Sequence, residues 1–417
     1  MNYFLLFILF TSLIQASKHK VKVVILGAGA SGISFAKTLS QSNMHDYIVL
    51  DAQSFVGGRV QHVDFCGNNV ELGANWIYGK GNNPIYLMAT KHGLVTAPND
   101  KANIAFYDHH GYLNDQSVGK NIYHQFEDVK ARLVQFAEKR LRHQQVDLPS
   151  RSALHLLDWI PNTPLKAAVE YFNIDWEFSE PAEICSLDYA TGTVDTVEGT
   201  YPLGNEFVVD QSGDIIEADY AVCTFSLGVL QSDLFALYAN NATQHGGYYT
   251  VWQNLNAPGY LSQSSQPILM VTTTHIESQR IERMSNHQVK AEIQEVLDTM
   301  FPNSEPIQDI LIPRWHQHPL FRGSYSNWPI GASREHHANM RAPLENRLWF
   351  AGEAMSADYY GFLHGAWLEG QSVAHDVLQC LEGTCPDHAK YEYVTGCDSN
   401  QMKFIKSTPR FIHQHFS

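Results

Sequence analysis

Residues 21–32 read VKVVILGAGASG. The β-branched run at 21–26 predicts a strand and residues 33–39 predict a helix, so the glycines stand in a tight turn between the two. A GxGxxG turn in this position lets the backbone approach a pyrophosphate, and the helix N-terminus supplies amide donors. The stretch therefore predicts the first unit of a doubly wound α/β domain that binds a dinucleotide. The residues expected to contact the dinucleotide here are Gly27, Gly29, Ser31 and Gly32.

A second apolar run and an arginine turn follow this unit. The run at 47–50 predicts the next strand and ends at Asp51, which lies 24 residues after Gly27. A carboxylate at that spacing accepts hydrogen bonds from an adenosine ribose. Enzymes that use NAD and enzymes that use FAD share these features, and glycine turns also have purely structural uses. The turn Gly57-Gly58-Arg59 favours a flavin, because it would put a guanidinium beside the diphosphate.

With these residues the chain resembles the flavin-containing amine oxidase family, and specifically the polyamine oxidases of plants and fungi. Residues 71–76, ELGANW, match the family intact, and residues 351–353, AGE, match its second flavin-binding motif. The resemblance implies an α/β fold in which a Rossmann-like FAD-binding domain of the GR2 type carries an inserted α+β substrate domain. The further FAD contacts that it implies are Asp51, Gly58, Arg59, Gly73, Ala74, Asn75, Trp76, Gly352, Glu353 and Phe362.

The resemblance also indicates how the flavin is held. Residues 361–366, GFLHGA, would begin a helix whose N-terminus points at the flavin ring and favours negative charge on the reduced form. Monoamine oxidases carry a cysteine near this helix for covalent attachment of the flavin. Residues 355–357 are Met-Ser-Ala here, so noncovalent FAD is expected.

The amine site is expected to be walled by aromatic side chains that exclude water and orient the substrate. By resemblance, Tyr325 and Phe362 would flank the substrate nitrogen, with Trp76 nearby and Trp315 at the flavin face. For a single Tyr or Phe the competing interpretation is an ordinary core aromatic, which the surrounding motifs argue against.

Carboxylates are expected along the path of a polyamine, because they offset the hydration that its charges lose. Glu177, in DWEFSEP, lies at the family's tunnel-glutamate position. An exposed structural glutamate is an equally weighted alternative. A second family glutamate is replaced by Tyr78.

The chain is expected to form two discontinuous domains between terminal segments, with further strands at 219–226 and 347–351 and surface helices at 123–143 and 286–300. The predicted parts are a signal peptide at 1–17, an FAD-binding domain at 20–95, 200–235 and 340–385, a substrate-binding domain at 96–199 and 236–339, and a tail at 386–417.

The N-terminus predicts export. Residues 4–14 are uncharged and apolar, too short to cross a bilayer as a mature helix but suited to a signal peptide cleaved after Ala16. A retained anchor or a buried first element are the alternatives. A secreted protein without stable membrane insertion is expected. The sequon at 241–243 fits that route, as does a small disulfide loop between Cys380 and Cys385.

The composition limits the classes of partner that the chain is expected to bind. With 44% hydrophobic residues the chain is globular, and its net charge of -15 disfavours nucleic acid while attracting cations. No Cys or His spacing indicates a metal site. The expected partners are therefore a small polyamine substrate and O2, and the sequence leaves the oligomeric state open.

Two internal blocks of the family are missing from the chain. One would fall between Gly204 and Phe207 and the other between Leu234 and Tyr238. The second block normally carries a substrate-domain strand with a lysine that holds water against the flavin. No lysine occurs between Lys166 and Lys290. Either the sequence is an incompletely assembled gene product, which we favour, or it is a relative that lost oxidase activity; in both cases unpaired strand edges threaten the fold.

Three functions are therefore weighed. The leading one is FAD-dependent oxidation of polyamines by O2 to aldehyde, amine and hydrogen peroxide, impaired by the missing lysine. The second is a noncatalytic protein that binds flavin or amines. The third, an NAD-linked dehydrogenase, explains GxGxxG but not the other three motifs.

Overall fold

The computed structural model describes residues 20–98, 103–191, 205–209, 235–239, 247–257, 260, 267–302 and 304–388. The predicted signal peptide, the predicted strand at 219–226, the sequon and nearly all of the predicted tail lie outside these residues. Within them, no helix combines the length and apolar character needed to cross a membrane.

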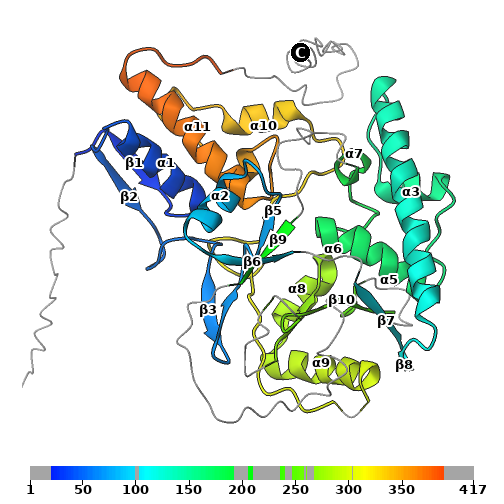
Figure 1. Cartoon of the computed structure of the whole chain (residues 1–417). Coiled ribbons are helices and arrows are strands. Elements are labelled where there is room, and N and C mark those ends of the chain that lie inside the picture. Colours follow the sequence, from blue (N-terminus) through cyan, green and yellow to red (C-terminus); the bar gives the residue numbers. More distant parts are fainter. Residues whose placement is uncertain are drawn as a thin grey trace, which may run out of the picture.

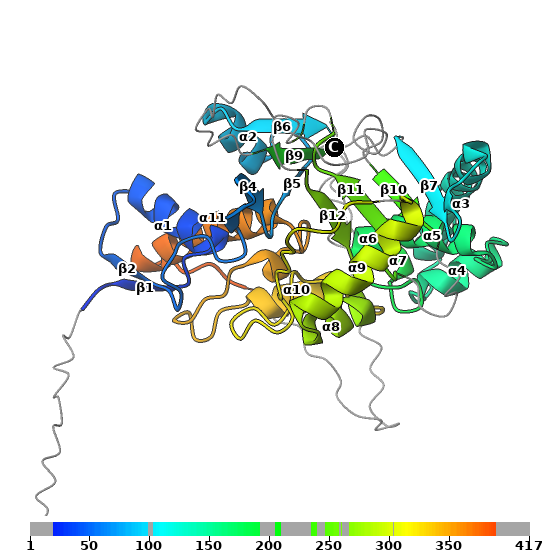
Figure 2. The ribbon, with the colours of Figure 1, turned by 90° about the horizontal axis from the view of Figure 1, so that it is seen from below.

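The glycine-rich stretch forms the predicted βαβ unit. Strand β1 (Val23–Leu26) leads through the glycine turn into α1 (Ala30–Gln41), and β2 (Tyr47–Leu50) pairs with β1 in parallel. The long helix α11 (Leu363–Leu381), from the other end of the chain, lies along α1 in both views (Figures 1 and 2). The α/β expectation for this domain is confirmed.

The second domain is built on a five-stranded sheet in the order β12-β11-β10-β7-β8. One face of the sheet packs on α3 and α5 and the other on α9, and the strand residues alternate between two separate cores. The elements are β7 (Ile104–Asp108), β8 (Gly111–Tyr112), β10 (Phe235–Tyr238), β11 (Val251–Asn254), β12 (Leu269–Thr272), α3 (Gln116–Arg142), α5 (Pro164–Asn173), α8 (His275–Arg283) and α9 (Asn286–Met300).

Shorter elements complete the fold. A hairpin and a three-stranded sheet in the order β5-β9-β6 follow the arginine turn. These elements are β3 (His62–Phe65), β4 (Asn68–Glu71), β5 (Trp76–Tyr78), β6 (Val95–Pro98), β9 (Asn205–Val209), α2 (Pro84–Lys91), α4 (Ser150–Leu156), α6 (Asp175–Phe178), α7 (Leu187–Ala190), α10 (Arg334–Arg341) and η1 (Glu353–Met355).

The two predicted surface helices are confirmed. The one expected at 123–143 is α3, which begins seven residues earlier, and the one expected at 286–300 is α9. Helix α9 begins at this point because Ser285 and Gln288 form a capping box, which satisfies amides at the first turn.

The second missing block does not open the sheet. Strand β10 occupies the place where that block would fall, and it pairs in parallel with β7 and antiparallel with β11. Phe235 and Leu237 are fully buried against the α3–α5 side. The nucleotide-binding side is less well covered, because Val24 and Leu26 on β1 are 50% and 76% exposed.

The strand predicted at 347–351 is wrong. Leu348 instead bonds back to Leu344 in a local turn, and Trp349 packs its ring against the α1–α11 core. A strand needs a hydrogen-bonded neighbour. Among the described residues, no strand pairs with 349–351. The apolar pattern of this segment therefore reflects side-chain packing rather than a place in a sheet.

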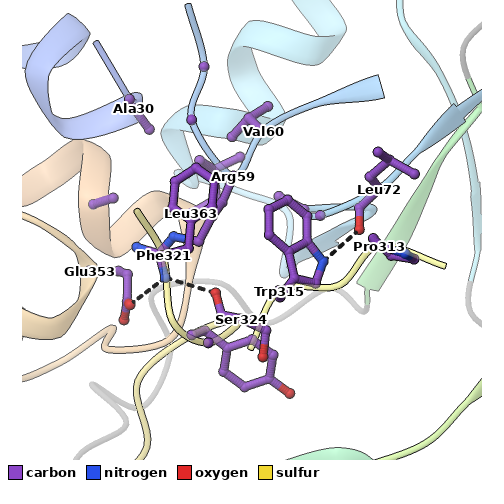
Figure 3. A pocket seen from close by; sticks show the side chains of 18 of the residues that line it. Ala30, Arg59, Val60, Leu72, Pro313, Trp315, Phe321, Ser324, Glu353 and Leu363 are labelled. Carbon is purple, nitrogen blue, oxygen red and sulfur yellow. Dashed lines mark hydrogen bonds and ion pairs between the residues drawn. The ribbon is translucent and has the colours of Figure 1, made fainter. Parts of the chain in front are cut away.

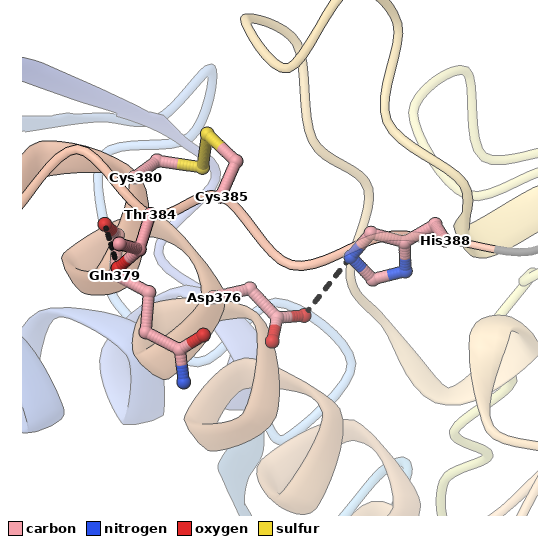
Figure 4. The surroundings of a disulfide bond; sticks show 6 residues. All are labelled: Asp376, Gln379, Cys380, Thr384, Cys385 and His388. Atoms are coloured by element: carbon pink, nitrogen blue, oxygen red, sulfur yellow. Dashed lines mark hydrogen bonds and ion pairs between the residues drawn. A yellow bond between two sulfur atoms is a disulfide. The ribbon is translucent and has the colours of Figure 1, made fainter.

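The predicted disulfide between Cys380 and Cys385 is confirmed, and it closes the chain over the end of α11 (Figure 4). Thr384 donates to the Gln379 carbonyl at 2.9 Å, and His388 lies 3.5 Å from Asp376 on the same helix. Cys66 and Cys185 are free thiols.

Gly370 allows α11 to cross α1 closely, because a Cβ at this position would lie 2.2 Å from the Ser31 carbonyl oxygen. We expect Gly370→Ala to lower the free energy of unfolding by about 1–3 kcal/mol, the usual cost of overpacking. Urea unfolding followed by circular dichroism measures this. His375→Ala, at an exposed position of the same helix, is the matched control, and equal stability of the two variants would contradict the close-packing argument.

Candidate active site

A cavity of about 2040 Å³ lies between the two domains. Its wall combines β1, the glycine turn, the arginine turn, β12 and the segments around 315–325 and 345–352. Every predicted site residue except Trp76 and Glu177 lines it. The lining members of the predicted set are Gly27, Gly29, Ser31, Gly32, Asp51, Gly58, Arg59, Gly73, Ala74, Asn75, Trp315, Tyr325, Gly352, Glu353 and Phe362.

The glycine turn leaves an open cradle at one end of this cavity. Gly27 has φ +109°, a conformation that favours glycine, and a Cβ built on it would meet nothing within 4 Å. Gly32 has the opposite constraint, because its Cβ would lie 2.0 Å from the Gly27 carbonyl oxygen. The Ser31 hydroxyl is buried and has no hydrogen-bond partner among the described residues. A phosphate oxygen would satisfy it, so the turn fits a dinucleotide.

Asp51 lies where β2 ends, beside this cradle. Its carboxylate accepts hydrogen bonds from the Ala28 amide at 2.6 Å and from the Gln53 amide at 2.7 Å. These two backbone donors, the Ala28 amide first, lower the pKa of Asp51. The side chain therefore stays ionised at neutral pH and can accept hydrogen bonds from a sugar hydroxyl.

Arg59 and Glu353 join the two ends of the chain at the cavity wall (Figure 3). Arg59 Nη1 lies 3.0 Å from Glu353 Oε1 and donates to the Ser324 carbonyl at 2.8 Å. Glu353 is buried and also accepts from both Ser326 groups, the amide at 3.1 Å and the hydroxyl at 2.5 Å, and from the Gly361 amide at 2.7 Å. Four donors therefore fix this carboxylate, while Arg59 keeps 39% of its side chain accessible.

Aromatic side chains form another part of the wall. The Trp315 indole donates to the Leu72 carbonyl at 3.3 Å (Figure 3). The Tyr325 hydroxyl is hydrogen-bonded to the Ser179 hydroxyl. Tyr325 as a residue is 43% exposed, and it lines the cavity. These hydrogen bonds hold the Trp315 indole and the Tyr325 hydroxyl in place.

Phe362, at the N-terminus of α11, also lines the cavity. Its ring lies 4.8 Å from Tyr78 and stacks on His364 at 5.2 Å, measured between centroids. Burial lowers the pKa of His364 to about 4, so this imidazole is neutral at physiological pH and brings no charge to the helix N-terminus.

Trp76 and Glu177 lie just outside the cavity lining. Trp76, on β5, is partly buried against the core of the second domain. Glu177, on α6, is partly buried. The pKa of Tyr78 is raised well above its usual value, first by burial of Tyr78 and then by the negative charge of Glu177. The functional roles predicted for these two residues stay predictions, as do those of the residues that line the cavity.

Glu180 and Asn327 are among the polar residues of the wall that sequence reasoning missed. Both stand inside segments that the resemblance had already picked out, DWEFSEP and GSYSNWP. No periodicity in the sequence shows which of Glu177 and Glu180 lines the cavity, because this depends on the direction in which the chain leaves α6. Their places inside those two segments were the only available signal.

A glycine turn that cradles phosphate, an ionised carboxylate for a ribose and a second domain closing the cavity define a two-domain dinucleotide-binding protein. The family model described as flavin containing amine oxidoreductase matches residues 30–180 and 237–378. The chain belongs to this family. This places it among the FAD-dependent amine oxidases.

Individual relatives agree with this assignment. Polyamine oxidase 1 of Zea mays is 30% identical over 476 residues, covering 89% of this chain and 93% of the relative. Polyamine oxidase 6 of Oryza sativa subsp. japonica is 31% identical over 467 residues, covering 88% and 92%. Both aligned lengths exceed the 417 residues of this chain, so the relatives carry residues that it lacks.

A solved structure shares the fold. Putrescine oxidase bound to putrescine superposes with a TM-score of 0.61 at 14% identity, covering 86% of this chain and 99% of that one. At this identity the likeness establishes the architecture, an FAD-binding domain with a substrate domain.

Glu353→Ala tests the junction between the two ends of the chain. It removes the acceptor for Arg59, Ser326 and Gly361, and we expect the free energy of unfolding to fall by about 3 kcal/mol, as when a buried pair loses one partner. Guanidinium unfolding of the purified protein measures the loss. Glu382→Ala, at an exposed position, is the control, and a loss no greater than the control's would show that the junction contributes little.

Proposed function

We propose that this protein oxidises polyamines at a carbon next to a secondary amine. The carbon loses a hydride and the nitrogen a proton, and both electrons reach O2, which becomes hydrogen peroxide. Water then splits the imine into an aldehyde and an amine. The observation that carries the proposal is the convergence of the dinucleotide cradle with Tyr325 and Phe362 on one cavity. The polyamine oxidases of maize and rice support the substrate class.

FAD, when bound, supplies the hydride acceptor of this reaction. The buried Ser31 hydroxyl and the Arg59 guanidinium would hold its diphosphate, and Asp51 its ribose. Residues 355–357 are Met-Ser-Ala, which offer no thiol for a covalent link, so we propose a noncovalent cofactor.

The substrate side would orient the amine between aromatic walls. Tyr325 and Phe362 would exclude water from the reacting carbon, with Trp315 towards the flavin. The charges of Glu177 and of the protein as a whole, -15, favour a cationic substrate. A noncatalytic protein that binds flavin or amines is the second candidate, and the lack of any lysine between Lys166 and Lys290 favours it.

Reconstitution with FAD tests the proposal. We expect yellow flavin absorbance and peroxide from spermine or spermidine, at a rate roughly 10²-fold below that of the maize relative, because one proton-handling group is lost. A coupled peroxide assay measures the rate, and inserting the relative's lysine-bearing block should raise it. Absent flavin absorbance would refute the cofactor assignment, whereas flavin without peroxide would favour the noncatalytic candidate.

We also propose that the protein is secreted. The apolar run at 4–14 and the Cys380–Cys385 disulfide support an oxidising, exported destination. Expression of the full chain in eukaryotic cells should deliver protein to the medium with Ser17 at its N-terminus, as read by mass spectrometry. Retention inside the cells with an intact Met1 would contradict this prediction.

A further inference from the structure

Glu180 is a cavity-lining carboxylate for which the sequence predicted no role. It follows α6 and lines the cavity together with Ser179, Tyr325 and Asn327, whereas Glu177 does not. Ser179 adopts the left-handed conformation, φ +58°, and so turns the chain out of the helix. This turn puts Glu180 in the wall and leaves Glu177 on the helix behind it.

The wall around Glu180 is held by hydrogen bonds from a second segment. The Asn327 side chain donates to the Phe178 carbonyl at 2.9 Å and also bonds the Glu180 carboxylate. The hydroxyl of Tyr325 is bonded to that of Ser179. The backbone that leads into Glu180 is therefore fixed at Phe178 and Ser179, and this preorganises the carboxylate for a ligand.

Glu180 differs from two neighbouring carboxylates of the same cavity in lacking a strong partner. Glu353 pairs with Arg59, and Glu282 accepts from the amides of His316 and Gln317 at 3.0 and 2.9 Å. Among the described residues, no lysine or arginine forms an ion pair with Glu180. Burial raises the pKa of the Glu180 carboxyl, and a cation beside it would offset that cost.

We propose that Glu180 binds an ammonium group of the substrate at a distance from the nitrogen that is oxidised. The accessible ring of Tyr325 adds a cation–π contact beside it. Glu180 then selects amines that carry a second positive charge over monoamines. This inference rests on the proposed function, and it makes Glu180 a specificity-determining residue.

The test compares wild type with Glu180→Gln, using spermidine and a secondary monoamine such as N-methylbutylamine. We expect KM for spermidine to rise roughly 10- to 100-fold, the usual worth of a hydrogen bond to a charged group, with kcat little changed. KM for the monoamine should stay the same, because it has no distal charge. Glu180→Asp should recover part of the loss. Glu183→Gln, whose side chain is 58% exposed and pairs with Arg151, is the matched control.

Several outcomes overturn the inference. An equal rise in KM for both amines would show a general effect on the cavity. A larger rise in KM for spermidine in Glu177→Gln would show that Glu177, not Glu180, binds the ammonium group. An unchanged KM for spermidine in Glu180→Gln would also refute it.

Binding separates this inference from the proposed function. If wild type forms no peroxide, spermidine titrated into the FAD-reconstituted protein is followed by its thermal stabilisation. Stabilisation that is lost in Glu180→Gln but kept in Glu183→Gln supports the inference although the oxidase proposal fails. No stabilisation of wild type overturns it.

Discussion

The ion pair between Arg59 and Glu353 is the constraint on which the rest of the site depends. It joins segments 294 residues apart, and Glu353 extends the junction to Ser326 and Gly361. A buried carboxylate is stable only when its charge is compensated, so Glu353 favours the structure in which all four segments are in place. The junction places the arginine turn, the aromatic segment and the start of α11 around one cavity.

The sequence predicted those parts of the fold that depend on local chemistry. The first βαβ unit and α9 follow from a glycine turn, an apolar period and a capping box, all within a few residues. The strand expected at 347–351 failed because a strand requires a distant partner, which an apolar run does not specify. The sequence also could not show that Glu180 rather than Glu177 lines the cavity. This depends on the left-handed conformation of Ser179, which local propensity does not predict.

The missing blocks affect the two domains differently. In the second domain, Phe235 and Leu237 supply the alternation that a central strand needs, so four residues restore the sheet between β7 and β11. On the nucleotide side, the exposed Val24 and Leu26 lie on the strand that leads into the cofactor turn. Among the described residues, the sheet of the second domain is therefore closed at β10, whereas β1 of the FAD-binding domain keeps apolar side chains exposed.

Binding of flavin and amine and the rate of oxidation depend on different groups in this chain. The groups that would hold the dinucleotide and orient an amine are fixed by contacts that do not pass through the missing blocks, as at Glu353 and Tyr325. The lost lysine is a group of another kind, because it would act on the reacting atoms without supporting the wall. Under the proposed function, such a chain keeps its affinity for flavin and amine while its rate of oxidation falls, since affinity and rate depend on different residues.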